Sequence, residues 1–517
     1  MSKTFVESFL DARRVSTPLV AIRTFDAAST ISNIRKAVND NTVPYISWDS
    51  IHGLKGLGDP DNEGSKVLNT LATLAGVELP TSLELPVALG LLEFAGEQNI
   101  IVFLHNPHLV WNNDPKVIQG MWNLRDLFTA NGNMLMPLIG AGDELPIELQ
   151  QDTLVLDEPL PTRAELAKIV DDSYDFALEE KRTWDISKKT PEIVKAACDA
   201  LIGIPAFPAG QSTAMCLNPD TGILDLSELW TRKKTIVSQR KGLSYHTGSE
   251  TLADMYGCAA FRKFAVRMME GKHAPTLILR MDEVQRQFSG NETDSSGSTG
   301  KLLGEFLTWV EDNKVICTLQ LGVPGSSKSW STYCIGGEYK KPVVNYNVAQ
   351  MEDKHVGEGN RHMLAANRTL DAISDGKIWL LATANNLRGL PPEFISRFQV
   401  GGIFFFDAPD AEEREGIMKL KVKKYNLEDQ PFPDMEGWTG RDVENCARKA
   451  DLLSVSLIEA GKLVVPLMKS HHEEMDALRH SAHDRFLSAS HEGVYQYTAP
   501  SAKTVVHAPV INGRKIR

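Results

Sequence analysis

A loop rich in glycine and serine at residues 322–329 directly follows the apolar run VICTLQL and ends in a lysine and a serine. Its form is GxxxxSKS, close to the pattern GxxxxGK[ST], in which glycines let consecutive backbone N–H groups turn towards a phosphate. Lys328 is expected to reach the β- and γ-phosphates of ATP, and the Ser329 hydroxyl is expected to ligate Mg²⁺. Ser327 stands where the pattern usually has glycine, and an ordinary surface loop is the alternative interpretation. The loop residues predicted to bind the nucleotide are Gly322, Pro324, Gly325, Ser326, Ser327, Lys328, Ser329 and Trp330.

A second candidate is the apolar run TLILRM, which ends in Asp282 and Glu283. A magnesium–nucleotide site needs one carboxylate that positions the metal and another that orients the attacking water. Adjacent acids at a strand end supply both, so Asp282 is predicted to serve the metal together with Ser329, and Glu283 to act in catalysis. Acids also favour helix N-termini, so a solvated helix start is the alternative for this pair.

Three further polar positions could complete such a site. The run KIWLLATAN ends at Asn385, whose amide could hold the attacking water from the side opposite the acids. Arg397, in LPPEFISRF, could stabilise transition-state charge at the γ-phosphate of a neighbouring subunit, or could be an ordinary surface arginine. Arg441 opens a helical Gly-Arg-Asp segment and could reach the phosphates in its own chain, although a plain helix start explains it equally well.

The elements that must position these residues indicate an α/β fold. Short β-rich runs alternate with helical patterns, which predicts tandem doubly wound parallel sheets. In the first half, strands are expected at Pro18–Arg23, Val43–Trp48, Asn99–Leu104, Asn133–Ile139 and Thr153–Leu156. In the second half, strands are expected at Thr276–Met281, Lys314–Leu321, Val343–Val348, Lys377–Thr383 and Gly402–Phe406.

The chain of 517 residues is too long for one core, so several domains are expected. Residues 133–165 and 377–413 share one order of features: a strand, a polar loop, a Leu-Pro-x-Glu helix start, a second strand and an Asp-x-Pro turn. This order favours a duplication. The predicted divisions are an α/β domain at 1–160, a helical region at 161–245 with a turn-rich stretch at 205–222, an ATPase domain at 246–409, a helical lid at 410–487 and an extended tail at 488–517.

Together, the P-loop, ILRMDE, ATANN, LPPEFISRF and the GRD segment resemble the AAA+ ATPases. More closely, the chain resembles the uncharacterised AAA ATPases of plastids and cyanobacteria, which begin with a degenerate AAA-like domain. Its first α/β unit lacks a P-loop, and Val465-Pro466-Leu467 leads into the helical run HHEEMDALRHSAHDRFL. The stretch FSGNETDSSGSTGKLLGEFLTWVEDN is also similar to that family. The resemblance implies that Tyr256 and Gly257, preceded by Met255, contact adenine.

The order of the motifs departs from that family. AAA+ proteins carry the P-loop (Walker A) strand before the acidic (Walker B) strand, whereas ILRMDE precedes the P-loop here. The strands after the P-loop, VVNYNVAQ and KIWLLATANN, do not end in Asp-Glu. We therefore expect a permuted motif order in which the acidic strand and its helix have moved forward as one block. Because strand ends in space define a sheet site, this strand should still lie in the sheet of the P-loop strand.

Composition limits the partners and the compartment. The formal net charge of −12 argues against a chain that coats nucleic acid, although a local basic groove remains possible. The six cysteines show no CxxC spacing, which fits a reducing compartment without a zinc ribbon. No run approaches the roughly 20 apolar residues of a membrane span. A cytoplasmic protein without membrane partners is expected.

Three functions are compatible with the sequence. The first is an ATPase that remodels a protein partner, although the loop AQMEDKHVGEG lacks the aromatic residue of AAA+ threading machines. The second is an ATPase acting on DNA or RNA, and the third is a nucleotide-dependent scaffold without hydrolysis. In the first unit, His105 and Asn106 take the place of the acids, so a structural or partner-binding role is expected there. A ring-shaped homo-oligomer, with six subunits, is expected to bring Arg397 to the neighbouring site.

Overall fold

A computed structural model describes residues 4–497 apart from 59–61, 77–83, 112–113, 141, 181–188, 219, 247, 289–297, 352–357 and 375. The chain forms two compact units, one of residues 1–245, 293–314 and 345–376 and the other of residues 246–292, 315–344 and 377–517. The domain expected at 246–409 is thus divided between the units. Its helices α13 (Ser298–Asp312) and α15 (Glu358–Ser374) belong to the first unit, where they pack against each other.

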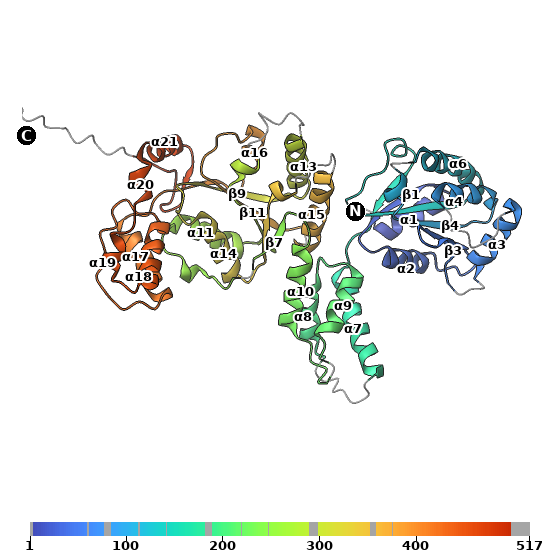
Figure 1. The fold of residues 1–517 in the computed structure, drawn as a ribbon, viewed down its shortest axis with the longest axis horizontal. Helices are drawn as coiled ribbons and strands as arrows, with labels where there is room; N and C mark the ends of the chain where they lie inside the picture. Colours follow the sequence, from blue (N-terminus) through green and yellow to red (C-terminus); the bar gives the residue numbers. More distant parts are fainter. Residues whose placement is uncertain are drawn as a thin grey trace, which may run out of the picture. The chain divides into compact units, whose positions relative to one another are not determined.

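The first unit begins with an α/β domain (Figure 1). Its strands lie in the order β3-β2-β4-β5-β1-β6. They are β1 (Val20–Thr24), β2 (Tyr45–Asp49), β3 (Gly53–Gly56), β4 (Ile101–His105), β5 (Met134–Gly140) and β6 (Leu154–Asp157). Its helices are α1 (Phe5–Arg14), α2 (Ala27–Val38), α3 (Glu63–Ala75), α4 (Leu85–Leu92), α5 (His108–Trp111) and α6 (Pro115–Asn131), with a 3₁₀ turn at Glu93–Ala95.

Helices cover both faces of this sheet, because the strands carry apolar side chains on both faces. In β4, Ile101 and Phe103 pack in a core with residues of α1 and α2, whereas Val102 and Leu104 pack with residues of α3, α4 and α6. Burial on both faces is typical of parallel sheets. The exception is β3, which pairs antiparallel with β2 after a turn in which the Asp49 carboxylate accepts the N–H groups of Ile51 and His52.

A helical region follows, and it shares one apolar core. It contains α7 (Arg163–Glu180), α8 (Pro191–Leu201), α9 (Ala206–Cys216) and α10 (Leu226–Ser238), and it ends at β7 (Leu243–Tyr245). The prediction of a turn-rich stretch at 205–222 was wrong, because the 11 residues of α9 occupy more than half of it. Pro205 precedes the helix start, where a missing N–H breaks no helical bond, and Ala209 and Thr213 bury one face.

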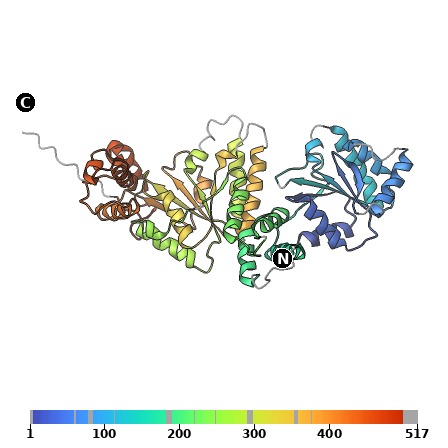
Figure 2. The same cartoon turned by 60° about the horizontal axis from the view of Figure 1, so that its bottom comes forward.

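The second sheet has the strand order β13-β12-β9-β11-β8-β10-β7 and is drawn from another side in Figure 2. Its remaining strands are β8 (Leu277–Met281), β9 (Ile316–Gly322), β10 (Val343–Tyr346), β11 (Ile378–Ala384), β12 (Ile403–Phe406) and β13 (Leu487–Ser488). The helices between them are α11 (Ala259–Glu270), α12 (Val284–Gln287), α14 (Lys328–Glu338) and α16 (Pro392–Ser396), with 3₁₀ turns at Leu252–Asp254 and Val348–Gln350.

The C-terminal part forms the predicted helical region, with a core around Trp438 and Cys446. Its helices are α17 (Ala411–Lys424), α18 (Gly440–Leu453), α19 (Leu457–Gly461), α20 (Leu467–Ser470) and α21 (His472–Ala482). The extended tail expected from residue 488 does not begin there. Leu487 and Ser488 pair with β12, and a turn brings Val494 and Tyr495 back against the strand. Residues 498–517 lie outside the described residues.

Candidate active site

Three neighbouring parallel strands bring the predicted motifs to one edge of the second sheet. β11 pairs with β9 on one side and with β8 on the other, so that Leu380 lies opposite both Cys317 and Leu279. The P-loop follows β9, Asp282 and Glu283 follow β8, and Asn385 follows β11. The prediction that the acidic strand and the P-loop strand share one parallel sheet is confirmed, although β8 comes first in the chain.

A cavity of about 340 Å³ opens at these strand ends. The second unit contributes all of its walls, from the P-loop, the strand ends, the segment before α11 and the lid helices α17 and α18. The lining residues are Asp254, Met255, Tyr256, Asp282, Glu283, Pro324, Gly325, Ser327, Lys328, Ser329, Trp330, Tyr333, Thr383, Asn385, Ile417, Leu420, Lys421, Gly440, Arg441 and Glu444.

Two positions of the P-loop require glycine, Gly322 and Gly325. Gly322 has φ 145°, and a Cβ there would lie 2.1 Å from the carbonyl oxygen of Phe406. Gly325 has φ 83°, and a Cβ there would lie 2.9 Å from Thr439 Oγ1. Ser327 also has a positive φ, 66°, and it immediately precedes α14. The loop therefore holds a left-handed residue at the position where the pattern usually has glycine.

Lys328 places its ammonium group inside this loop. Its Nζ donates to the carbonyl oxygens of Gly322 (2.8 Å) and Val323 (2.7 Å), and the residue is only 7% exposed. Burial lowers the pKa of Lys328 to about 7, against the opposing charge of Asp282. A phosphate beside the ammonium would favour its charged form.

Asp282 is bound by two hydroxyl groups and one guanidinium group. Ser329 donates to its Oδ1 at 2.8 Å, Thr383 donates to the same oxygen at 2.5 Å, and Arg280 approaches Oδ2 at 2.5 Å. Burial would raise the pKa of Asp282, but the bond from Thr383 and the charge of Arg280 outweigh it, so the pKa is lowered. The carboxylate is therefore ionised at neutral pH. Because Ser329 donates its proton to Asp282, the lone pairs of its oxygen remain available to a cation.

Glu283 is oriented by the neighbouring strand end. Its N–H donates to the Thr383 hydroxyl at 3.0 Å, and its own φ is 48°. The Asn385 amide lies 3.4 Å from Glu283 Oε1, and Arg286 lies 2.6 Å from Oε2. The structure thus brings the predicted base and the predicted water-holding amide together.

The lid meets the P-loop at the start of α18. The Arg441 N–H donates to the Gly325 carbonyl at 3.2 Å, and Arg441 itself lines the cavity. Thr439 caps this helix with Asp442: the Asp442 N–H donates to the Thr439 hydroxyl, and the Thr439 N–H donates to the Asp442 carboxylate, which fixes the helix start against the loop. The arginine suggested by the Gly-Arg-Asp segment therefore lies at the site within its own chain.

Aromatic and apolar side chains, with a few charged ones beside them, also line the cavity. The Tyr256 ring packs so closely on Gly416 of α17 that a Cβ there would lie 2.3 Å from its Cε1. Trp330 donates from Nε1 to the Asp254 carbonyl at 3.3 Å, and Lys421 lies 5.5 Å from the centre of its ring. Two aromatic rings and the apolar side chains of Ile417 and Leu420 in the lining offer a nucleotide base surfaces on which it can pack.

Most of the predicted site residues line the cavity, but some do not. Gly322 and Ser326 shape the loop behind it, and Gly257, with φ 83°, packs against Glu413. Arg397 caps the C-terminal end of α16 and lies near Cys317, at the start of β9. Burial raises the pKa of the Cys317 thiol, and the charge of Arg397 lowers it by a smaller amount. The P-loop follows the other end of β9, so Arg397 takes no part in the cavity of its own chain.

Sequence reasoning missed several residues of the site. Thr383 and Arg280 bind Asp282, and Tyr333, Lys421 and Glu444 line the cavity. A charged residue within the apolar run TLILRM was the one available signal for Arg280. The lid residues lie far along the chain from the P-loop, and no local pattern connects them to it.

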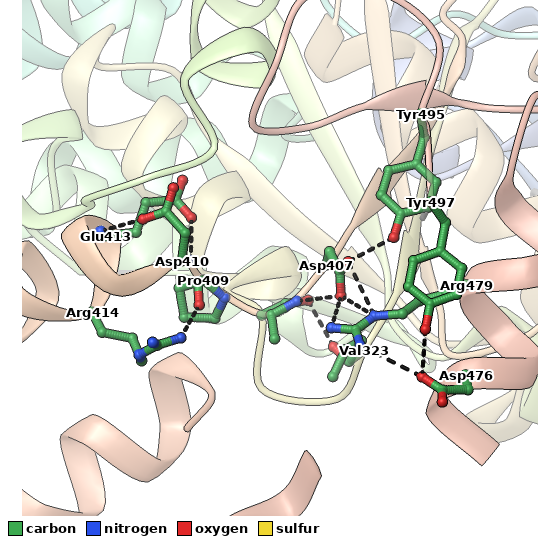
Figure 3. Close-up of polar contacts among 12 residues, drawn as sticks. Val323, Asp407, Pro409, Asp410, Glu413, Arg414, Asp476, Arg479, Tyr495 and Tyr497 are labelled. Carbon is green, nitrogen blue, oxygen red and sulfur yellow. Dashed lines mark hydrogen bonds and ion pairs between the residues drawn. The ribbon is translucent and has the colours of Figure 1, made fainter. Parts of the chain in front are cut away.

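Beside the P-loop, side chains of the C-terminal segment (residues 479–497) form hydrogen bonds with Asp407, at the end of β12 (Figure 3). The Val323 N–H donates to the Phe406 carbonyl at 3.0 Å, and the next residue, Asp407, accepts two bonds at Oδ1 and Oδ2 from Arg479 Nε (2.9 and 3.1 Å). The Tyr495 hydroxyl donates to Asp407 Oδ2 at 2.6 Å. The C-terminal segment is thus part of the support of the P-loop.

The first domain has a different arrangement at the equivalent place. β1 lies between β5 and β6, as β9 lies between β11 and β12, and α2 follows it directly. There the Glu158 carboxylate accepts bonds from the hydroxyl groups of Thr24 (2.7 Å) and Thr30. The Asp26 side chain accepts the Ser29 N–H at the start of α2. Burial raises the pKa of Glu158.

The chain is similar in sequence to known proteins. Residues 3–158 match the family model described as the N-terminal domain of SpoVK-like AAA ATPases. The uncharacterized AAA domain-containing protein ycf46 of Guillardia theta is 19% identical over 496 residues, which cover 88% of this chain and 86% of that protein. The chain is similar to AAA domain proteins over most of its length. The resemblance inferred from the motifs is thereby confirmed.

Two further AAA relatives carry the same description. That of Trieres chinensis is 23% identical over 452 residues, covering 79% of both chains. That of Pyropia yezoensis is 18% identical over 447 residues, covering 79% of this chain and 80% of its own. Within the described part of this AAA-like chain, none of the helices has the length and apolarity needed to cross a membrane.

Proposed function

We propose that the chain binds ATP with Mg²⁺ and hydrolyses it, using the released free energy to remodel a macromolecular partner. The observation that carries the proposal is the single cavity that collects Lys328, the Ser329–Asp282 pair and the Glu283–Asn385 pair. A phosphate-binding cation, a metal-binding pair and an oriented base are the parts that phosphoryl transfer to water requires.

Each residue has a role that its contacts support. Lys328 and Arg441 would neutralise phosphate charge from two sides, since one belongs to the P-loop and the other to the lid. Glu283, oriented by Asn385, would accept the proton of the attacking water. Tyr256 and Trp330 would enclose the base.

The donors at Ser329 and Asp282 fit magnesium, which prefers oxygen ligands and keeps several of its waters. Ser329 would bind the ion directly, and Asp282 would hold the Ser329 hydroxyl and accept from a metal-bound water. When bound, magnesium would neutralise charge on the phosphate oxygens.

The first domain would bind no nucleotide. The carboxylates of Glu158 and Asp26 stand beside the N-terminal end of α2, where a phosphate would have to approach. Like charges in that position oppose a phosphate. This supports a structural or partner-binding role for the domain.

A steady-state ATPase assay tests the function. Turnover stimulated by unfolded protein, and by neither DNA nor RNA, would support the remodelling of a protein. Stimulation by nucleic acid would instead support the second class of partner. Binding of ATP without turnover under every condition would leave a nucleotide-dependent scaffold and contradict the enzyme.

Glu283→Gln provides the matched variant for this assay. It keeps the size of the side chain and removes the basic oxygen, so ATP binding should persist while turnover falls by about 100-fold or more. Asn385→Ala should give a smaller loss, because the amide acts through Glu283 and water. Full turnover by Glu283→Gln would show that another group is the base.

A further inference from the structure

An arginine lies directly beside the carboxylate that serves the metal. Arg280 belongs to the acidic strand β8, and only 10% of its side chain is exposed. Its Nη2 lies 2.5 Å from Asp282 Oδ2. A buried cation at this distance is a permanent part of the electrostatic environment of the site.

The contacts of Asp282 already use most of its lone pairs and neutralise its charge. An ionised carboxylate has about four lone-pair positions. Ser329 and Thr383 occupy both positions on Oδ1, and Arg280 occupies one on Oδ2. A cation therefore meets a carboxylate that is already neutralised by an arginine.

Tyr333 holds Arg280 in place. Its hydroxyl accepts from Arg280 Nη1 at 2.7 Å, and the guanidinium carbon lies 4.8 Å from the centre of its ring. Tyr333 lies one helical turn after Ser329 on α14, so the Arg280–Tyr333 contact links the same two elements that supply the Asp282–Ser329 pair. The ring also stacks on His246, with centroids 3.7 Å apart.

We propose that Arg280 is a positioning residue that weakens the binding of free Mg²⁺ at Asp282, so that magnesium enters this site together with the nucleotide. The inference rests on the proposed function of the cavity and concerns its regulation by the metal.

The balance of charges gives the direction of the effect. Arg280 already pairs with Asp282, Arg286 pairs with Glu283, and Lys328 and Arg441 line the same cavity, so a divalent ion alone adds two positive charges to carboxylates that cations already neutralise. The phosphates of a nucleotide supply the missing negative charge. Two effects oppose each other when Arg280 is replaced: Asp282 loses an anchor, and a metal ion at Asp282 would no longer meet the repelling charge that lies 2.5 Å from this carboxylate. The second effect is the larger, because it acts on a doubly charged ion inside a partly buried cavity.

The test compares variants that separate charge from geometry. Arg280→Met removes the charge at similar length, Arg280→Lys keeps the charge, and Tyr333→Phe removes only the hydroxyl that holds Arg280. The first measurement is the melting temperature without nucleotide at increasing Mg²⁺. The second is the Mg²⁺ dependence of the affinity for a fluorescent ADP analogue.

Arg280→Met should respond to Mg²⁺ without nucleotide, and its half-saturating Mg²⁺ concentration should be about ten-fold lower than that of the unaltered chain. Arg280→Lys should behave like the unaltered chain, and Tyr333→Phe should lie between the two. Equal Mg²⁺ dependence in all four proteins would overturn the inference, as would a Lys variant that behaves like the Met variant.

The results separate a failure of the proposed function from a failure of the role of Arg280. If the unaltered chain binds no ADP analogue at any Mg²⁺ concentration, the proposed function fails. If it binds but the variants share one Mg²⁺ dependence, only the role of Arg280 fails. Arg280→Gln repeats the removal of charge with a polar side chain, in case the Met variant does not fold.

Discussion

Lys328 lies in the P-loop and is buried, so the protonation of its ammonium group affects the stability of the folded chain. Its pKa in the folded chain is lowered to about 7 by burial, whereas an exposed lysine in the unfolded chain titrates near 10.4. Between these two values the unfolded state binds the additional proton, so the stability of the folded state rises with pH. The penalty for burying the charge is complete below pH 7 and vanishes above the unfolded pKa.

Lys328→Met should remove this dependence. Without nucleotide, the melting temperature of the unaltered chain should rise from pH 7 to pH 9 relative to that of the variant, with a limit of about 1.4 kcal/mol per pH unit. Scanning calorimetry at three pH values measures the difference. The variant should also lose ATP binding. Parallel pH profiles would show that the ammonium is not desolvated as its contacts indicate.

Ser327 carries a backbone strain that a glycine would relieve. At φ 66°, a residue with a Cβ costs about 1 kcal/mol more than glycine, although glycine also has more entropy to lose from the unfolded chain. Ser327→Gly should therefore raise the melting temperature slightly and leave ATP affinity equal or higher.

The neighbouring serine is the matched control for this substitution. Ser326 has no positive φ, and its buried hydroxyl donates to the Val323 carbonyl at 2.6 Å. Ser326→Gly should lower the melting temperature and weaken ATP binding. If Ser327→Gly destabilises the chain as much as Ser326→Gly does, the side chain of Ser327 has a role beyond occupying the turn.

At the scale of elements, the C-terminal hairpin supports the P-loop through β12. Tyr495 and Arg479 bind Asp407, and Asp407 follows the residue whose carbonyl pairs with Val323. Tyr495→Phe removes a hydrogen bond to a charged, half-buried acceptor, a loss of about 1.5–3 kcal/mol. We expect a lower melting temperature and weaker ATP binding, measured by calorimetry and by titration of a fluorescent analogue.

Tyr497 offers a control in the same hairpin. Its hydroxyl donates to Asp476 at 2.8 Å, one step further from the P-loop. Tyr497→Phe should lower the melting temperature by a similar amount but change ATP affinity less. Equal losses of affinity in both variants would mean that the hairpin stabilises the domain as a whole without a specific path to the P-loop.

The predictable elements are those whose pattern is long and local. Each expected strand is present within a few residues, because a buried parallel strand is a continuous apolar run bounded by polar turns. β7 and β13 were missed because two or three residues are too few for a pattern, and β3 was missed because its sequence, GLKG, begins and ends in glycine. The fold of residues 488–497 depends on contacts with β12 and Asp407, which no local signal reports.

The same distinction applies to the site. The P-loop and the Asp-Glu pair were predictable because neighbouring residues along the chain supply them. The pairing of Ser329 with Asp282 followed from the rule that parallel strand ends meet. Arg280 and Thr383 became visible as partners of Asp282 only with three-dimensional contacts. Arg397 was predicted to act on the site of a neighbouring subunit, and because it lies outside the cavity of its own chain, this remains a prediction about assembly.

At the scale of the whole molecule, the cations around the cavity bear on how many chains complete one site. Lys328 and Arg441 belong to the chain that holds the P-loop. Hydrolysis of ATP generally gains from a further cation near the γ-phosphate in the transition state. Arg397 ends a helix that follows β11, and we propose that it reaches the site of the next subunit in a ring, with six subunits as the expected number. A head-to-tail contact of this kind closes into a ring when the rotation between subunits allows it.

A mixing experiment tests this arrangement. Arg397→Ala and Lys328→Met chains should each be inactive alone, the first for want of the trans arginine and the second for want of ATP binding. When they are mixed, some interfaces pair an intact P-loop with an intact Arg397, so part of the activity should return. Specific activity of the unaltered chain should also rise with protein concentration, because only assembled subunits possess a complete site. Arg388→Ala, a substitution at an exposed arginine between β11 and α16, is the control, and it should stay active without mixing. Turnover independent of concentration, together with no rescue on mixing, would place Arg397 among the surface residues and leave each chain with a site complete in itself.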